Sequence, residues 1–176
     1  GGKLREPILR LAGWARAFDA TSASGAWAVP NTSDPGTRLG QSPLRSPSVF
    51  NFFRPGYVPP NSAIGGAGLV APEFQLTNES STVGYINFMQ RVVANGTALG
   101  DVKADYGRVL PLADDAAALL AELNTVLAAG QLGTATLATI QGALASMPAG
   151  TDAARTNRLY AALTMVFAAP EYLVLK

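Results

Sequence analysis

The fold is indicated most clearly by the stretch DDAAALLAELNTVLAAG at residues 114–130. Its leucines and valine recur every three to four positions, the spacing of one face of an α-helix. Two aspartates stand at its start, where side-chain oxygens can cap a helix, and Gly130 follows the last apolar residue, where helices commonly end. We therefore predict a helix from about residue 114 to residue 129.

The same spacing predicts four more helices along the chain. They lie at about residues 134–146, 151–168, 78–95, and from residue 4 or 7 to residue 18. Short connections make the last three helices antiparallel neighbours. Because no segment reads as a convincing strand, the predicted fold class is all-α: a bundle of about five helices forming a single helical domain over residues 1–176.

Residues 20–76 differ from the rest in their density of proline, glycine and serine. Asp34-Pro35-Gly36 is a turn signal, and Ser46-Pro47 is positioned to cap a short helix carrying Val49, Phe50 and Phe53. A long irregular segment inside a compact domain is uncommon and usually functional, disordered or packed on something. Its aromatic residues argue against simple disorder.

The composition excludes several classes of function. The net charge is +1, so there is no electrostatic drive toward nucleic acid, and no apolar run approaches the roughly 20 residues of a membrane span. The chain has no histidine and no cysteine. This excludes disulfides, thiolate nucleophiles, Cys/His zinc sites and Ser-His-Asp triads within the chain.

The start of the chain runs almost at once into helical sequence, with no signal peptide before it. This beginning is typical of a fragment. Charged residues make up only 14% of the chain, against about 25% in typical domains. Such a low fraction suggests a chain that is well buried or that hides surface against partners.

A resemblance to a known family rests on four ordered motifs. They are Gly2-Lys3-Leu4-Arg5-Glu6-Pro7; Leu39-Gly40-Gln41 with Ser46-Pro47-Ser48-Val49-Phe50-Asn51-Phe52-Phe53 and Pro55-Gly56-Tyr57; Ala129-Gly130-Gln131-Leu132; and Ala169-Pro170-Glu171-Tyr172-Leu173-Val174. In order and spacing they resemble the C-terminal third of the domain-of-unknown-function 1800 family. A tryptophan common in the second motif of that family is replaced here.

The resemblance has four implications. The chain would be the C-terminal part of a longer bacterial protein, and that protein would be exported, to the periplasm or outside the cell. The partner would be the missing N-terminal portion or another protein chain. No reaction is established for the family, so the resemblance assigns no catalytic residue and no cofactor.

The candidate ligand site is the stretch from Arg38 to Tyr57. Arg38, Arg45 and Arg54 are the only charged residues between Asp34 and Glu73. Guanidinium groups bind carboxylate, phosphate or sulfate, and aromatic faces stack on rings or sugars. The aromatic members of the candidate site are Phe50, Phe53 and Tyr57.

The alternative is that this stretch is a coil packed on the helices, with its arginines bonded to backbone carbonyls. In a site, at least two guanidinium groups should converge on one concavity. In a scaffold, the three should point apart.

No metal site is predicted. Asp101 and Asp105 stand four residues apart, and Asp114-Asp115 is explained by helix capping, whereas a hard cation needs several oxygens.

Three interpretations of the function remain open. The first is a structural or interaction module of a larger exported bacterial protein. The others are part of an enzyme whose active site lies mainly in the missing N-terminal portion, and a binder of an anionic or carbohydrate ligand through the Arg38–Tyr57 stretch.

Overall fold

The computed structural model describes residues 2–176, and about half of the chain, 52%, is helical. The five longer helices lie within a residue or two of the predicted positions. They are α1 (Pro7–Ala17), α3 (Glu79–Asn95), α4 (Ala116–Ala128), α5 (Thr134–Ala145) and α6 (Asp152–Ala168). Short helices α2 (Ala63–Gly66) and α7 (Pro170–Leu173) and the 3₁₀ helices η1 (Pro72–Leu76), η2 (Ala98–Gly100) and η3 (Leu110–Asp114) complete the helical part.

The prediction of an all-α fold is confirmed only in its helical part, because residues 2–176 also contain four short strands. Strand β1 (Lys3–Leu4) pairs antiparallel with β4 (Val174–Leu175), and β2 (Thr21–Ser22) pairs antiparallel with β3 (Val102–Lys103). Each strand is two residues long, too short for an alternating pattern to be visible in the sequence. The chain is therefore mostly helical rather than purely α-helical.

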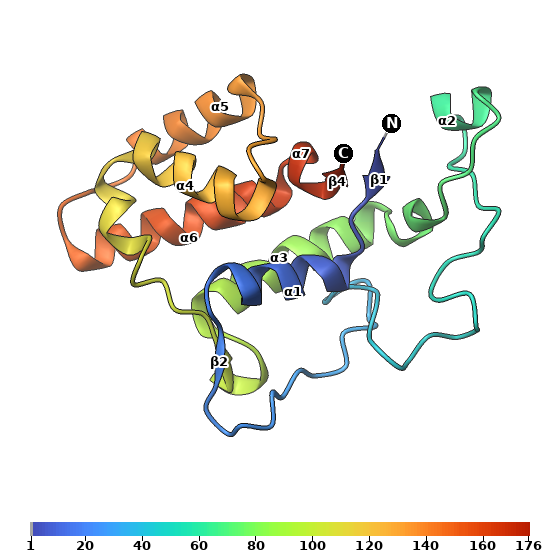
Figure 1. Ribbon diagram of the computed structural model, residues 1–176, viewed down its shortest axis with the longest axis horizontal. Helices are drawn as coiled ribbons and strands as arrows, with labels where there is room; N and C mark the ends of the chain where they lie inside the picture. Colours follow the sequence, from blue (N-terminus) through green and yellow to red (C-terminus); the bar gives the residue numbers. More distant parts are fainter. Residues whose placement is uncertain (1) are drawn as a thin grey trace.

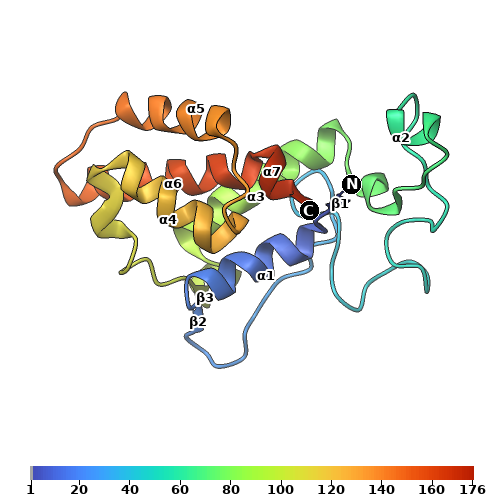
Figure 2. The ribbon, with the colours of Figure 1, turned by 45° about the horizontal axis from the view of Figure 1, so that its top comes forward.

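The helices form two groups that share one core. Helices α4, α5 and α6 lie together, and α1 and α3 run along their other side (Figures 1 and 2). Helix α3 packs along α6, and α1 packs against α4. Both groups contribute large, fully buried side chains to the shared core: Trp14, Met89, Leu119, Leu123, Leu163 and Phe167.

Side-chain caps explain where the helices begin. Asp115 accepts hydrogen bonds from the N–H groups of Ala117 and Ala118, so the predicted cap at the start of α4 is confirmed for this residue. Asp114 does not cap α4. Its carboxylate accepts the N–H of Gly150 and pairs with Arg155 at 2.6 Å, which ties the start of α4 to the start of α6.

The chain between β2 and α2, residues 23–62, contains no helix or strand, and this segment is called the coil below. It runs past α1 and out to α2 (Figure 1). The short helix predicted after Ser46-Pro47 is wrong. Instead, Ser48 and Asn51 form an isolated antiparallel bridge, and the Ser48 hydroxyl accepts the N–H of Phe50 at 3.2 Å. Asn51 has φ +69°, a left-handed conformation that a helix cannot continue through.

Candidate functional site

The three arginines of the predicted site occupy different environments. Arg38 donates from its guanidinium to the carbonyl of Asn31. Arg45 is exposed at the edge of a groove beside α1. Arg54 is exposed, and its main-chain N–H donates to Oε1 of Gln75 at 2.7 Å.

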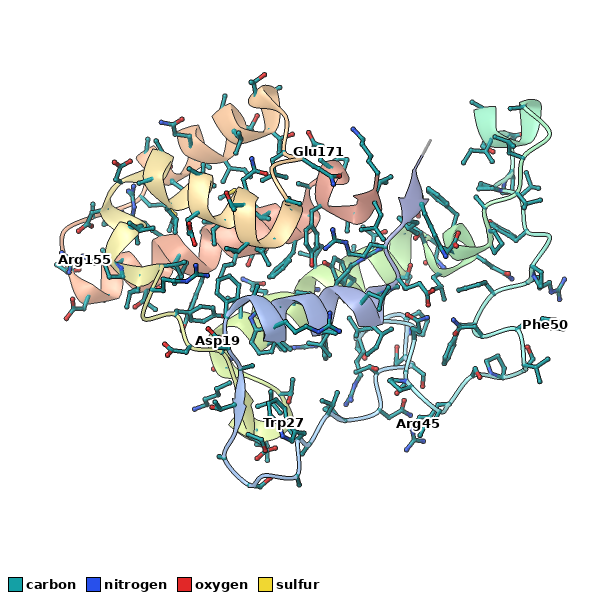
Figure 3. All side chains as sticks on the ribbon, in the orientation of Figure 1. Asp19, Trp27, Arg45, Phe50, Arg155 and Glu171 are labelled. Carbon is teal, nitrogen blue, oxygen red and sulfur yellow. The ribbon has the colours of Figure 1, made fainter. Side chains whose placement is uncertain are left out.

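The predicted aromatic residues differ in how far they are exposed. Phe50 is 58% exposed, whereas Phe53 and Tyr57 are half-buried. Figure 3 shows Arg45 on the coil that runs below α1 and Phe50 farther out on the arm leading to α2. Arg45 and Phe50 thus lie apart, and Arg38 and Arg45 line different hollows. The ligand site over the whole Arg38–Tyr57 stretch stays a prediction.

Arg38 lies beside Arg91, which the sequence did not point to. Both line a hollow of about 520 Å³ between the coil, α3 and η2, and no acidic side chain lines it. The Arg91 guanidinium donates to the carbonyl of Thr37 at 2.8 Å, which fixes it next to Arg38. Arg91 lies far along the chain on α3, so only the folded structure reveals the pairing.

The second hollow is a groove of about 470 Å³ between α1 and the coil. Ile8, Leu11, Trp14 and Ala15 of α1 form one wall, and the coil forms the other. The remaining lining is mostly apolar as well: Ala12, Trp27, Val29, Pro30, Asn31, Ser42, Pro43, Arg45, Thr97 and Val102. Arg45 is the only charged residue among them.

Trp27 stands at the rim of this groove and was missed in the sequence. It is 56% exposed, and its φ of +51° is a left-handed conformation that costs energy for a bulky residue. Its main-chain N–H donates to the Ser22 hydroxyl at 3.0 Å. In the sequence, the one feature that could have drawn attention to Trp27 is that it stands alone in a run of serine, glycine and alanine.

Asp101 holds the coil that carries Trp27. Its carboxylate accepts the N–H groups of Ser24 and Ala28, both at 2.8 Å, and the hydroxyl of Ser22 at 3.0 Å. Hydrogen bonds from Ser24, followed by Ala28, lower the pKa of the Asp101 carboxyl to about 2. The exposed position of Trp27 is therefore set by defined contacts, not by a loose loop.

A second set of contacts holds the coil on the opposite side of the groove. Glu6 accepts hydrogen bonds from the side-chain amides of Gln41 and Asn51, the latter at 3.1 Å. The buried Gln41 also accepts the N–H of Ile8 at 3.2 Å. These residues come from the first two motifs that carry the family resemblance.

The other motifs also meet in the scaffold. The Arg5 guanidinium lies 4.3 Å from the centroid of the Tyr172 ring, which joins the first motif to the last. Glu171 accepts the hydroxyl of Thr136 at 2.7 Å and the N–H of Gly133 at 3.2 Å, just after the third motif. Arg5, Glu171 and Tyr172 thus join elements that lie far apart along the chain.

Exposed large apolar side chains concentrate between residues 20 and 76. They are Trp27, Val29, Leu44, Val49, Phe50, Val58, Leu69 and Val70. A hollow of about 360 Å³ lined by Leu44 and Val49 shares Ile8, Ser42 and Pro43 with the groove. The two hollows therefore adjoin along this part of the coil.

Two further classes of site were sought in the part of the chain that the structure describes. Within residues 2–176, no three His, Cys, Asp or Glu side chains gather as metal ligands would. No helix in that range combines the length and apolarity needed to cross a bilayer.

Comparison with known proteins gives a family and no activity. Residues 1–174 match the family model described as "Protein of unknown function (DUF1800)". No curated protein matches the chain, and no solved structure does. Since the match covers essentially the whole chain, the chain belongs to the DUF1800 family of proteins of unknown function.

Proposed function

We propose that this chain is an interaction module whose coil face packs against another polypeptide. The coil face is defined here as Trp27, Val29, Leu44, Val49 and Phe50, together with the groove beside α1. The observation that carries the proposal is the exposure of these large apolar side chains along one stretch of coil, beside two adjoining hollows. Monomeric proteins rarely leave such surface in water, and contiguous patches usually mark interaction sites.

The coil face is held in place before any partner arrives. Asp101 fixes its first part through Ser24 and Ala28, and Glu6 fixes its later part through Gln41 and Asn51. A surface that is already ordered loses little conformational entropy on binding. The apolar area that a partner covers then contributes to affinity at about 25 cal/mol per Å² before the general costs of association.

The proposed occupant is a polypeptide segment with apolar side chains and one acidic group. Apolar side chains fit the walls of the groove, and the acidic group complements Arg45, its only charged lining residue. The family resemblance makes the N-terminal portion of a longer, exported bacterial parent the favoured source of this segment.

Co-purification tests the proposal. The chain is co-expressed with the polypeptide encoded immediately ahead of residue 1 in its gene, and the complex is measured by size-exclusion chromatography. We expect a complex that a Leu44→Ser/Val49→Ser/Phe50→Ser variant weakens at least tenfold. A Leu9→Ser/Val83→Ser variant, which removes exposed apolar residues of α1 and α3, serves as the matched control.

Two results would overturn the proposal. One is equal complex formation by both variants. The other is a gene in which no coding sequence precedes residue 1, together with a chain that stays monomeric and binds no apolar dye.

A second candidate function is supported by the hollow between Arg38 and Arg91. Two guanidinium groups that share one hollow without an acid repel each other unless an anion lies between them. We propose this hollow as the place where an anionic ligand, such as a sulfated oligosaccharide, would bind. Arg38→Ala/Arg91→Ala should then abolish binding of that probe while Arg54→Ala leaves it unchanged, and equal binding by all three proteins would refute the idea.

A further inference from the structure

Arg10 is a buried cation with no carboxylate partner. It lies on α1 and is only 5% exposed. Its Nε donates to the carbonyl of Arg5 at 2.8 Å, and its guanidinium carbon lies 4.5 Å from the centroid of the Tyr85 ring. Within residues 2–176, no acidic group forms an ion pair with it.

A second guanidinium makes the environment of Arg10 more positive. Arg5 lies over the Tyr172 ring and donates to the carbonyl of Leu127 at 3.4 Å, and its buried Nε has no hydrogen-bond partner. Burial lowers the pKa of Arg10, and the nearby charge of Arg5 lowers it further, against the opposing effect of the tyrosines. The two arginines therefore share a region that lacks a compensating negative charge.

The neighbouring tyrosines cannot supply that charge. Burial raises the pKa of Tyr85 far above its usual value and raises the pKa of Tyr172 to about 12, so both are neutral phenols at physiological pH. Their ring faces attract the guanidinium groups by cation–π interactions, worth about 2 kcal/mol when desolvated. Burying an unpaired charge destabilises a protein by more than this. An anion beside Arg10 would therefore offset part of the free-energy penalty of burying its charge.

A pocket of about 90 Å³ opens beside Arg10. Ser81 and Tyr85 also line it, and the hydroxyl of each already donates to a carbonyl, that of Leu76 at 2.8 Å and that of Phe167 at 3.1 Å. Arg10 is the one charged residue in the lining of this pocket. The aliphatic lining residues are Leu4, Leu39, Leu76, Ile86 and Leu173.

We propose that this pocket binds a short aliphatic monocarboxylate, of about the size of acetate to butyrate. The carboxylate would pair with the Arg10 guanidinium, which presents a donor fork suited to two oxygens. The aliphatic tail would lie among Leu39, Leu76 and Ile86. Bare inorganic anions would leave these apolar walls uncovered, and a long acyl chain exceeds the volume. The site is separate from the coil face and does not depend on its proposed role.

The test is a melting-temperature titration of the full chain with butyrate, confirmed by calorimetry. Butyramide, which has the same shape without charge, and sodium chloride at equal ionic strength are the control ligands. We expect the melting temperature to rise and saturate with butyrate and to stay unchanged with butyramide. No rise with butyrate through the millimolar range would overturn the proposal, and so would an equal rise with chloride or phosphate.

Three variants separate binding from structure. Arg10→Met keeps the length of the side chain and should abolish the response to butyrate, while Arg16→Met, on the exposed side of the same helix, should retain it. Ala168→Leu narrows the pocket while keeping Arg10, and it should weaken the response at least tenfold, even if Arg10→Met does not fold. A full response in Ala168→Leu, or in a folded Arg10→Met, would contradict the assignment.

Discussion

Trp14 and Trp27 line the same groove, but Trp14 is 1% exposed and Trp27 is 56% exposed. They are the only two tryptophans in the chain. Trp14 belongs to the core, and its indole N–H donates to the hydroxyl of Tyr106 at 2.8 Å. Trp27 stands at the rim, where a partner would cover it. One groove therefore joins the core of the chain to its proposed interaction surface.

The close approach of α3 to the coil gives a first prediction. A methyl group at Gly84 would collide with the main chain of Pro35 and lie 2.8 Å from the carbonyl of Gly36. We expect Gly84→Ala to destabilise the chain by about 1–3 kcal/mol, because backbone must shift to admit the methyl group. Urea unfolding measures the change. Gly142→Ala in α5, where the methyl group meets nothing within 4 Å, should stabilise by about 1 kcal/mol.

Arg158 gives a second prediction, because its buried side chain connects three helical elements. Its guanidinium donates to the carbonyls of Ala113 at 2.6 Å, Leu144 at 2.8 Å and Met147 at 3.1 Å, and so joins η3, the end of α5 and α6. Arg158→Met should lower the free energy of unfolding by roughly 3 kcal/mol, since buried carbonyls lose their donors. The more exposed Arg155 provides the comparison, and Arg155→Met should change the midpoint of unfolding only slightly. Equal losses of unfolding free energy in the two variants would contradict this role of Arg158.

The low pKa of Asp101 predicts how the coil responds to acid. The carboxyl has a pKa of about 2 in the folded chain against an ordinary value of 3.8. Its contribution to stability is therefore fully present above pH 3.8 and is lost as the pH falls through 2. NMR titration of the Ser24 and Ala28 amides should show a midpoint near pH 2. Asp101→Asn should remove that titration, and a midpoint near 3.8 would contradict the hydrogen bonds described.

The helices were predictable because the signals that define them are local. Leu119, Leu123 and Leu127 recur at helical spacing, and Asp115 and Asn78 stand where a cap is needed. The two-residue strands carry no such pattern, since β1 and β4 pair across nearly the whole length of the chain. Periodicity within a window cannot reveal a pairing of that kind.

The course of the coil was not predictable for a similar reason. It depends on hydrogen bonds that Ala28 donates to Asp101 and that Gln41 donates to Glu6, between residues far apart in the sequence. The stretch from Arg38 to Tyr57 stood out because arginines and aromatics are close along the chain. In the folded structure, Arg38 lies instead beside Arg91, and the burial of Arg10 was not visible in its helical position.

The most direct test of the interaction module is fluorescence of Trp27 in a Trp14→Phe variant. When the polypeptide encoded ahead of residue 1 is added, we expect the Trp27 emission to shift to shorter wavelength and its quenching by acrylamide to fall severalfold. A Trp27→Phe variant, which reports only Trp14, should show neither change. Unaltered emission and quenching of Trp27 under conditions where the two polypeptides co-purify would contradict the coil face as the docking surface.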